Sequence, residues 1–230
     1  MITKRWNLLM FLALYGVGVA LSLNAGGARA EPVDAAGVIQ QIDLYDALLK
    51  YPQPAWISGQ MEPAELLDQS EFFKEQNGPT FIIEQIPDGQ SFERWTSLFA
   101  IVAEELQPDQ AVPMQTFVGL SVEVNRRACV EDGFGVQVLG SDERSTIAVM
   151  VCDSVADGPP EVGYGPGVGE VSIWRFVVFE NTYLKIYQRW RGLAFDIDVR
   201  GGWPVAEAEM LEMVRRITDQ VEVLPNHLRR

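Results

Sequence analysis

The run of residues 183–191 combines cationic and aromatic side chains in a pattern suited to an anionic partner. Successive side chains of a β-strand point to opposite faces of the sheet, so Leu184, Ile186 and Trp190 share one face. Guanidinium groups bind carboxylates through paired hydrogen bonds, and cations stack on aromatic rings. We therefore predict that the opposite face binds an acidic protein, a carboxylate ligand or an anionic glycan. The candidate residues are Tyr183, Lys185, Tyr187, Arg189 and Arg191, with Arg175 of the preceding strand beside them.

A second interpretation of the same residues is structural. Long Lys and Arg side chains often lie along apolar surface, while their charged ends pair with nearby Glu and Asp. In that case the cationic face of residues 183–191 covers the sheet and binds nothing. The sequence alone leaves both interpretations open.

Histidine is almost absent, since the chain has one, His227, three residues from Arg230. Terminal segments of domains are often poorly ordered. Ser-His or Cys-His nucleophilic catalysis therefore lacks a base in the fold, and a histidine-bound zinc site lacks ligands. We predict no catalytic residue, no metal site and no cofactor, and hence a protein that is not an enzyme.

Carboxylates keep one catalytic alternative open, because the chain has 32 Asp and Glu residues. A pair such as Glu84 and Glu93 could act on a glycosidic bond if both lined one cleft. Catalysis would also require a raised pKa on one of the two. A carboxylate-based periplasmic hydrolase and a small-ligand carrier therefore remain alternatives to a non-catalytic binding protein.

Cys129 and Cys152 are the two cysteines of the chain. An even pair in an exported protein is most simply a disulfide. A redox-active or metal-binding pair is the alternative, but the two lack Cys-x-x-Cys spacing and have no histidine near them. The sequence predicts a Cys129–Cys152 disulfide.

Residues 1–30 have the pattern of a secretory signal peptide. Lys4 and Arg5 precede an apolar run, Leu8–Leu23, and the segment ends in Ala28-Arg29-Ala30. Cleavage after Ala30 would make Glu31 the first residue of the mature protein. An N-terminal membrane anchor is the alternative, but the apolar run has 16 residues, whereas a spanning helix needs about 20.

The predicted mature protein, residues 31–230, is strongly acidic. Removal of residues 1–30 takes away three of the 18 basic residues and none of the 32 acidic ones, so the remaining 200 residues carry a net charge of −17. Such acidity repels phosphate backbones and anionic membrane surfaces. We predict a periplasmic or secreted protein that binds no nucleic acid and has no membrane span after cleavage.

Turn residues and apolar periodicity predict mainly strands in the middle of the chain. Asn77-Gly78 lies between two apolar runs, as in a β-hairpin, and a short helix carries Phe92 and Trp95. The other expected strands are Leu98–Leu106, Gly133–Leu139, Thr146–Cys152, Val171–Glu180 and Tyr183–Trp190.

Two longer helices are expected, one from Pro113 to about Arg127 and one that opens at Pro204. Apolar residues at helical spacing should form their buried faces. In the first helix these are Met114, Phe117, Leu120 and Val124. In the second they are Val205, Ala208, Leu211, Val214, Ile217 and Val221.

The order of these elements predicts the fold class. Strands follow one another through turns, without the strand–helix alternation of a doubly wound parallel fold. We therefore expect a single α+β domain over residues 31–230, with a mainly antiparallel sheet flanked by helices.

The run Phe81–Trp95 resembles a segment of bacterial exported proteins in the PsbP-like, Mog-type α/β/α-sandwich superfamily. In those proteins a strand that ends in Glu-x-x-Pro is followed by a glycine, a short helix, a tryptophan and another strand. Glu84, Pro87, Gly89 and Trp95 occupy these places here. The resemblance implies an antiparallel sheet flanked by helices and a non-enzymatic role as an assembly factor or binding module, and it carries over no catalytic residue.

These observations predict an exported, non-catalytic binding or assembly-accessory protein of the bacterial cell envelope. Its partner is expected to be an unknown protein or an acidic ligand in the periplasm. The cationic face of residues 183–191 is the predicted contact surface.

Overall fold

A computed structural model describes residues 40–58, 65, 68–156 and 165–226 of the chain. These residues belong to one compact unit, Ala35–Arg230. The predicted signal peptide and His227 lie outside the described residues. Among the residues described, no helix has both the length and the apolar character that a membrane crossing requires.

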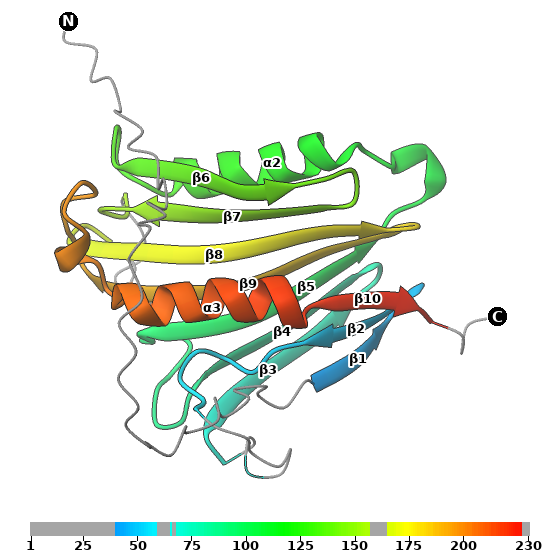
Figure 1. Cartoon of the computed structure of the whole chain (residues 1–230), viewed down its shortest axis with the longest axis horizontal. Coiled ribbons are helices and arrows are strands. Elements are labelled where there is room, and N and C mark those ends of the chain that lie inside the picture. The colour runs from blue at the N-terminus through cyan, green and yellow to red at the C-terminus, as the bar shows by residue number, and fades with distance from the viewer. Residues whose placement is uncertain (1–39, 59–64, 66–67, 157–164, 227–230) are drawn as a thin grey trace, which may run out of the picture. The chain divides into compact units, whose positions relative to one another are not determined.

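A seven-stranded sheet forms the centre of this unit (Figure 1). Every neighbouring pair of its strands is antiparallel. The strands are, in spatial order, β3 (Ser70–Asn77), β4 (Thr80–Pro87), β5 (Ser97–Glu105), β9 (Thr182–Leu193), β8 (Val168–Phe179), β7 (Ser145–Cys152) and β6 (Phe134–Ser141).

A smaller sheet and one helix cover the first face of the seven-stranded sheet. The smaller sheet has the order β1-β2-β10, with β1 at Gln40–Leu44, β2 at Ala47–Tyr51 and β10 at Glu222–Pro225. Helix α3, Glu207–Gln220, runs directly into β10 and packs against β8, and Figure 1 shows it in front of β9. The main core lies between these layers, and its fully buried side chains include Leu49, Phe99, Ile173, Ile186, Met213 and Ile217.

Helix α2, Met114–Arg127, packs on the second face over β7 and β8. Its buried residues Met114 and Phe117 contact a second apolar cluster. The sheet residues of that cluster include Ala100, Met150, Trp174, Phe176, Tyr183 and Tyr187. The Phe117 ring meets the rings of Phe176 and Tyr183 edge to face, with centroids 5.6 and 5.2 Å away.

The predicted fold class is wrong in its balance of helix and sheet. The described residues form ten strands, two α-helices and two short 3-10 helices, Pro108–Gln110 and Arg200–Gly202, so the fold is sheet-dominated rather than a sheet flanked by helices. The cause lies in β1 and β2, which take the place of a covering helix. Each has five residues, and so short an apolar run cannot be assigned to strand or helix by periodicity.

Several local predictions are confirmed. The hairpin expected at Asn77-Gly78 is present as β3–β4: Asn77 pairs with Thr80, and the turn is Gly78-Pro79, where Gly78 has a φ of +57° that glycine adopts without steric cost. The central strands lie within a few residues of their expected bounds. The short helix expected at Phe92 and Trp95 is wrong, because this segment is a turn closed by a bridge between Ser91 and Arg94.

Each helix buries only part of the face expected for it, since Met114, Phe117 and Ile217 are buried as predicted but other residues of the predicted stripes are exposed. In α2 the buried residues are Met114, Phe117 and Ser121, while Leu120 and Val124 are 60% and 68% exposed. Helix α3 begins at Glu207 rather than at Pro204. Its buried residues are Met210, Met213 and Ile217, whereas Ala208 and Leu211 of the predicted stripe are exposed.

Candidate functional site

Strand β9 is buried on both faces along most of its length. Leu184, Ile186 and Trp190 point into the main core, as the alternation predicts. Tyr183 and Tyr187, expected on an accessible cationic face, belong instead to the apolar cluster beneath α2. Of the predicted site residues, the structure brings together Tyr183, Lys185, Tyr187, Arg189 and Arg191 on the α2 side of the sheet.

Arg175 does not lie with them. In the β8–β9 register it is opposite Ile186, and directly opposed residues share a face, so Arg175 lies on the α3 side. Its Nη1 donates to the carbonyl oxygens of Ile217 and Thr218 at 2.8 and 2.9 Å. These carbonyls belong to the last turn of α3, where a cation is favourable. The position of Arg175 beside the predicted site is therefore corrected.

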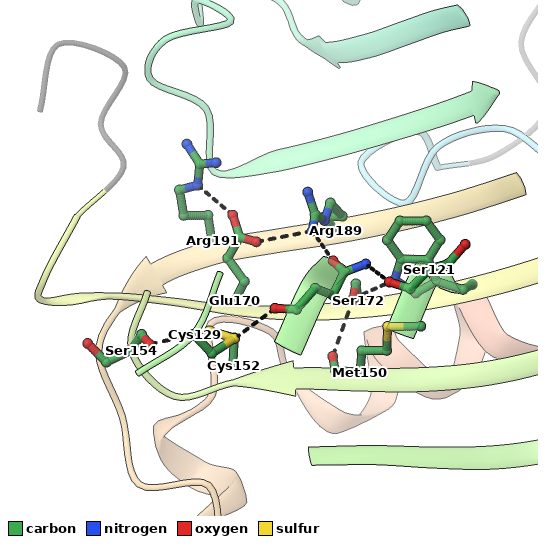
Figure 2. A network of polar contacts seen from close by, with 11 residues as sticks. Ser121, Cys129, Met150, Cys152, Ser154, Glu170, Ser172, Arg189 and Arg191 are labelled. Atoms are coloured by element: carbon green, nitrogen blue, oxygen red, sulfur yellow. Dashed lines mark hydrogen bonds and ion pairs between the residues drawn. A yellow bond between two sulfur atoms is a disulfide. The ribbon is translucent and has the colours of Figure 1, made fainter. Parts of the chain in front are cut away.

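The carboxylate of Glu170 on β8 holds the two arginines of β9 (Figure 2). Arg191 Nε donates to Glu170 Oε1 at 2.9 Å, and Arg189 Nη2 lies 3.5 Å from Glu170 Oε2. Glu170 is 5% exposed. A buried carboxylate needs ionic partners and hydrogen bonds to offset its lost hydration, and the arginines provide them.

Helix α2 takes part in this network through Asn125. Arg189 Nη2 donates to Asn125 Oδ1 at 2.6 Å, and Asn125 Nδ2 donates to the carbonyl oxygen of Ser121 at 2.8 Å. Asn125 thus joins the helix to the charged residues on the sheet. The network fixes the last turns of α2 over β8 and β9.

Aromatic rings pack near the guanidinium groups of both arginines. The Arg191 guanidinium lies 3.7 Å from the ring centroid of Trp95, and the Arg189 guanidinium lies 5.5 Å from that of Trp174. Trp174 Nε1 in turn donates to the hydroxyl of Ser172 at 2.7 Å. Arg189 and Arg191 are therefore engaged within the protein, in agreement with the structural interpretation of the cationic face.

The predicted disulfide between Cys129 and Cys152 is present. Cys129 follows the end of α2, and Cys152 ends β7 directly opposite Glu170 in the register. Figure 2 shows the disulfide next to the Glu170 carboxylate network. The covalent bond and the ionic network therefore hold the same end of α2 to the sheet.

A groove of about 280 Å³ lies between α2 and the middle of the sheet. We call it the α2 groove. Its wall on the helix is formed by Phe117, Leu120 and Val124, and its floor on the sheet by Val102, Lys185 and Tyr187. The two exposed apolar residues of α2 thus lie at its rim, where they can reach a molecule that enters it.

Lys185 is the cation of the β9 face that lies in the α2 groove. Its Nζ lies 3.4 Å from Glu104 Oε1 and 5.3 Å from the ring centroid of Phe117. Both charged side chains of this pair remain partly accessible to water. Partly exposed pairs of this kind contribute up to about 1 kcal/mol, so a carboxylate from outside could replace Glu104 as the partner of Lys185.

A catalytic pair of carboxylates requires a raised pKa on one residue and a cleft that both residues line. The structure meets the first condition. Burial raises the pKa of Glu84 above its ordinary value, although the positive charge of Arg189 acts in the opposite direction. The pKa of Glu93 is lowered by a hydrogen bond from its own backbone N–H and by one from Ser91. Neither residue lines the α2 groove, whose one lining carboxylate is Glu104. The geometry therefore gives no support to a hydrolytic pair in this groove.

In the described part of the chain, no three His, Cys, Asp or Glu side chains are placed to hold a metal ion. Sequence patterns point to no binding role for four residues of the site, Glu170, Asn125, Leu120 and Val124. Glu170 and Asn125 have no local signal, because their roles depend on contacts across elements. Leu120 and Val124 have a local signal, their helical spacing, but it predicts a buried face rather than the wall of a groove.

No family model and no curated protein matches the chain. Two similar solved structures are Mog1 proteins. A Mog1 E65A mutant has a TM-score of 0.42 and 10% identity over 83% of this chain and 98% of its own. The Ran-binding protein Mog1p of Saccharomyces cerevisiae has a TM-score of 0.41 and 10% identity over 82% and 96%. The resemblance to the PsbP-like, Mog-type superfamily stays a prediction, and we transfer neither fold nor function from these structures.

Proposed function

We propose that this protein is a non-catalytic binding module that receives an apolar segment of a partner protein in the α2 groove. The observation that carries the proposal is the exposure of Leu120 and Val124, at 60% and 68%, on the rim of that groove. Contiguous exposed apolar residues next to a hollow are typical of interaction sites. The carboxylate of an acidic residue in the partner would pair with Lys185 on the floor.

A protein segment fits the α2 groove better than a small carried molecule. Small-molecule sites usually bury most of the ligand, whereas the apolar residues Leu120 and Val124 of this groove lie on its exposed outer rim. Side chains of a partner could fill the groove while its backbone stays outside and contacts Leu120 and Val124. This mode resembles the way that amphipathic segments are bound in apolar grooves.

Site-specific photo-crosslinking tests the proposed contact. A photoreactive phenylalanine derivative in place of Leu120 should form a covalent adduct with one partner protein in the native cell, and mass spectrometry identifies it. The matched control is Leu211 on α3, another exposed leucine, at 55%, which should form no such adduct. Adding Val124→Asp should reduce the Leu120 adduct at least about tenfold, because a carboxylate would then face an apolar surface.

The contrary outcomes are distinct. Equal adducts from positions 120 and 211 would mean that contacts are non-specific. If position 120 gives no adduct while anilinonaphthalene sulfonate, an apolar probe with one anionic group, binds the wild type and not Val124→Asp, the groove is a small-ligand site. Stability should change little in either variant, since surface substitutions are usually within about 0.5 kcal/mol.

We further propose that the protein works in the bacterial periplasm or outside the cell, as an accessory to envelope assembly, after cleavage behind Ala30. Support comes from the signal-peptide pattern of residues 1–30 and from the disulfide, which is typical of oxidising compartments. The intact mass of protein recovered from the periplasmic fraction should correspond to residues 31–230. A mass that includes residues 1–30 would contradict cleavage and favour an anchor.

A further inference from the structure

Strand β6 is one edge of the seven-stranded sheet, and among the described strands it pairs on one side only, with β7. It has eight residues, Phe134–Ser141, in the sequence Phe-Gly-Val-Gln-Val-Leu-Gly-Ser. An edge strand presents backbone N–H and C=O groups that can accept a further strand. The question is which residues of β6 present them.

The hydrogen-bond pattern of the β6–β7 pair shows which residues of β6 direct their backbone groups away from β7. Asp153 N–H donates to the carbonyl oxygen of Gly133 at 2.9 Å, which makes these two a hydrogen-bonded pair. In an antiparallel pair such residues alternate with residues whose backbone groups point the other way. Gly135 and Gln137 therefore bond to β7, while Phe134, Val136 and Val138 direct their N–H and C=O away from it. After Val138 a register shift ends the regular ladder.

Strand β6 lacks the residues that usually prevent an edge strand from pairing with a further strand. Native proteins commonly blunt an edge with charged residues or proline. The opposite edge, β3, follows that rule with Glu71, Lys74 and Glu75. Strand β6 has no charged residue and no proline, and its Val136 and Val138 are 45% and 54% exposed.

Charge at the two ends of β6 selects the kind of strand that could be added. Glu131 and Asp132 precede β6, and Asp142, Glu143 and Arg144 follow it. In antiparallel self-pairing the acidic start of one copy would meet the acidic end of the other, and both copies carry a net charge of −14 over the whole chain. Like charges in this arrangement oppose a second copy and favour a strand with basic ends.

We propose that the β6 edge binds an extended segment of another protein by strand addition. The bound segment is uncharged in its middle and carries Lys or Arg at both ends. Its backbone pairs with Phe134, Val136 and Val138, and its alternate side chains lie beside the valines. This surface is separate from the α2 groove, which lies over β5, β8 and β9.

A peptide titration tests this inference on the folded protein. The probe is a fluorescein-labelled peptide of alternating threonine and valine with a lysine pair at each end, and fluorescence anisotropy measures its binding. Val136→Pro removes one outward N–H without touching the bonds to β7, and proline is tolerated at an edge in this position. We expect this variant to bind the probe at least about tenfold more weakly, and Val138→Lys to weaken it by repulsion.

Two controls decide the outcome. Val124→Lys in the α2 groove should bind the probe like the wild type, and a probe that is N-methylated at every second residue should not bind. Circular dichroism confirms that each variant is folded. If Val136→Pro does not fold, Val138→Lys alone tests the β6 edge. Equal binding by wild type and both β6 variants would overturn the proposal, as would loss of binding in Val124→Lys. If sedimentation shows that the wild type is a dimer and that Val138→Lys is a monomer, self-pairing of β6 would replace the proposal.

Discussion

Replacing Glu170 with alanine should lower the free energy of unfolding by about 3–5 kcal/mol, the cost of leaving buried charges without their partner. Glu170 is the carboxylate that both Arg189 and Arg191 contact, at 3.5 and 2.9 Å. Without it, the two guanidinium groups would lose the buried carboxylate that both of them contact. Urea unfolding of the wild type and of Glu170→Ala measures the difference.

The matched control for this prediction is an exposed ion pair. Glu222 accepts from Lys50 at 2.8 Å, but its side chain is 54% exposed, so Glu222→Ala should cost less than about 1 kcal/mol. Glu170→Gln keeps a hydrogen-bond acceptor and should fall between the two. If Glu170→Ala costs no more than Glu222→Ala, water reaches the arginines and the network does not hold α2.

Removal of the disulfide should have the second-largest effect. Cys129 and Cys152 are 23 positions apart, and a cross-link of this span stabilises by about 3 kcal/mol in the chain-entropy model. The Cys129→Ala/Cys152→Ala protein should therefore unfold at a lower urea concentration, with the loss arising mainly in the unfolded state. The same titration of both proteins measures it.

Reduction provides the control for the cysteine prediction. The wild type unfolded in the presence of a thiol reductant should shift toward the double variant, whereas the variant itself should not respond to the reductant. A double variant as stable as the oxidised wild type would contradict a stabilising role for the bond. A reductant effect on the variant would mean that the shift has a cause other than the disulfide.

The ionic network and the proposed function meet at Asn125. This residue accepts from Arg189 and also lines the α2 groove. The arginines of β9 therefore affect the groove indirectly, because they hold in place the helix that forms its wall. Lys185 lines the groove, whereas Arg189 and Arg191 do not, so Lys185 is the cation that a partner could reach. In this arrangement the cationic strand positions the binding surface more than it forms it.

Local patterns predicted much of the secondary structure. The span of α2, the Asn77-Gly78 hairpin and the alternation of β9 all depend on neighbouring residues, so they can be read from one segment at a time. The balance between helix and sheet could not be read in this way. Strands β1 and β2 are too short for periodicity to distinguish them, and β2 pairs with β10 at the other end of the chain.

The phase of α2 shows why an accurate span is not enough. At about 100° per residue, a helix places Leu120 and Val124 on the flank of the face centred on Met114 and Ser121. Both faces are consistent with apolar spacing of three and four residues. The sheet decided between them, because the residues that contact Trp174, Phe176 and Tyr183 are Met114, Phe117 and their neighbours.

The sequence by itself determined that residues 183–191 alternate, that the protein is acidic, and that Cys129 has one possible partner in the chain. Only the tertiary structure decided that the cationic face of β9 is covered by α2 and neutralised by Glu170, and that Arg175 lies on the other side. The physical reason is that alternation reports which side chains share a face. Whether water or another layer covers that face depends on packing between segments far apart in the chain.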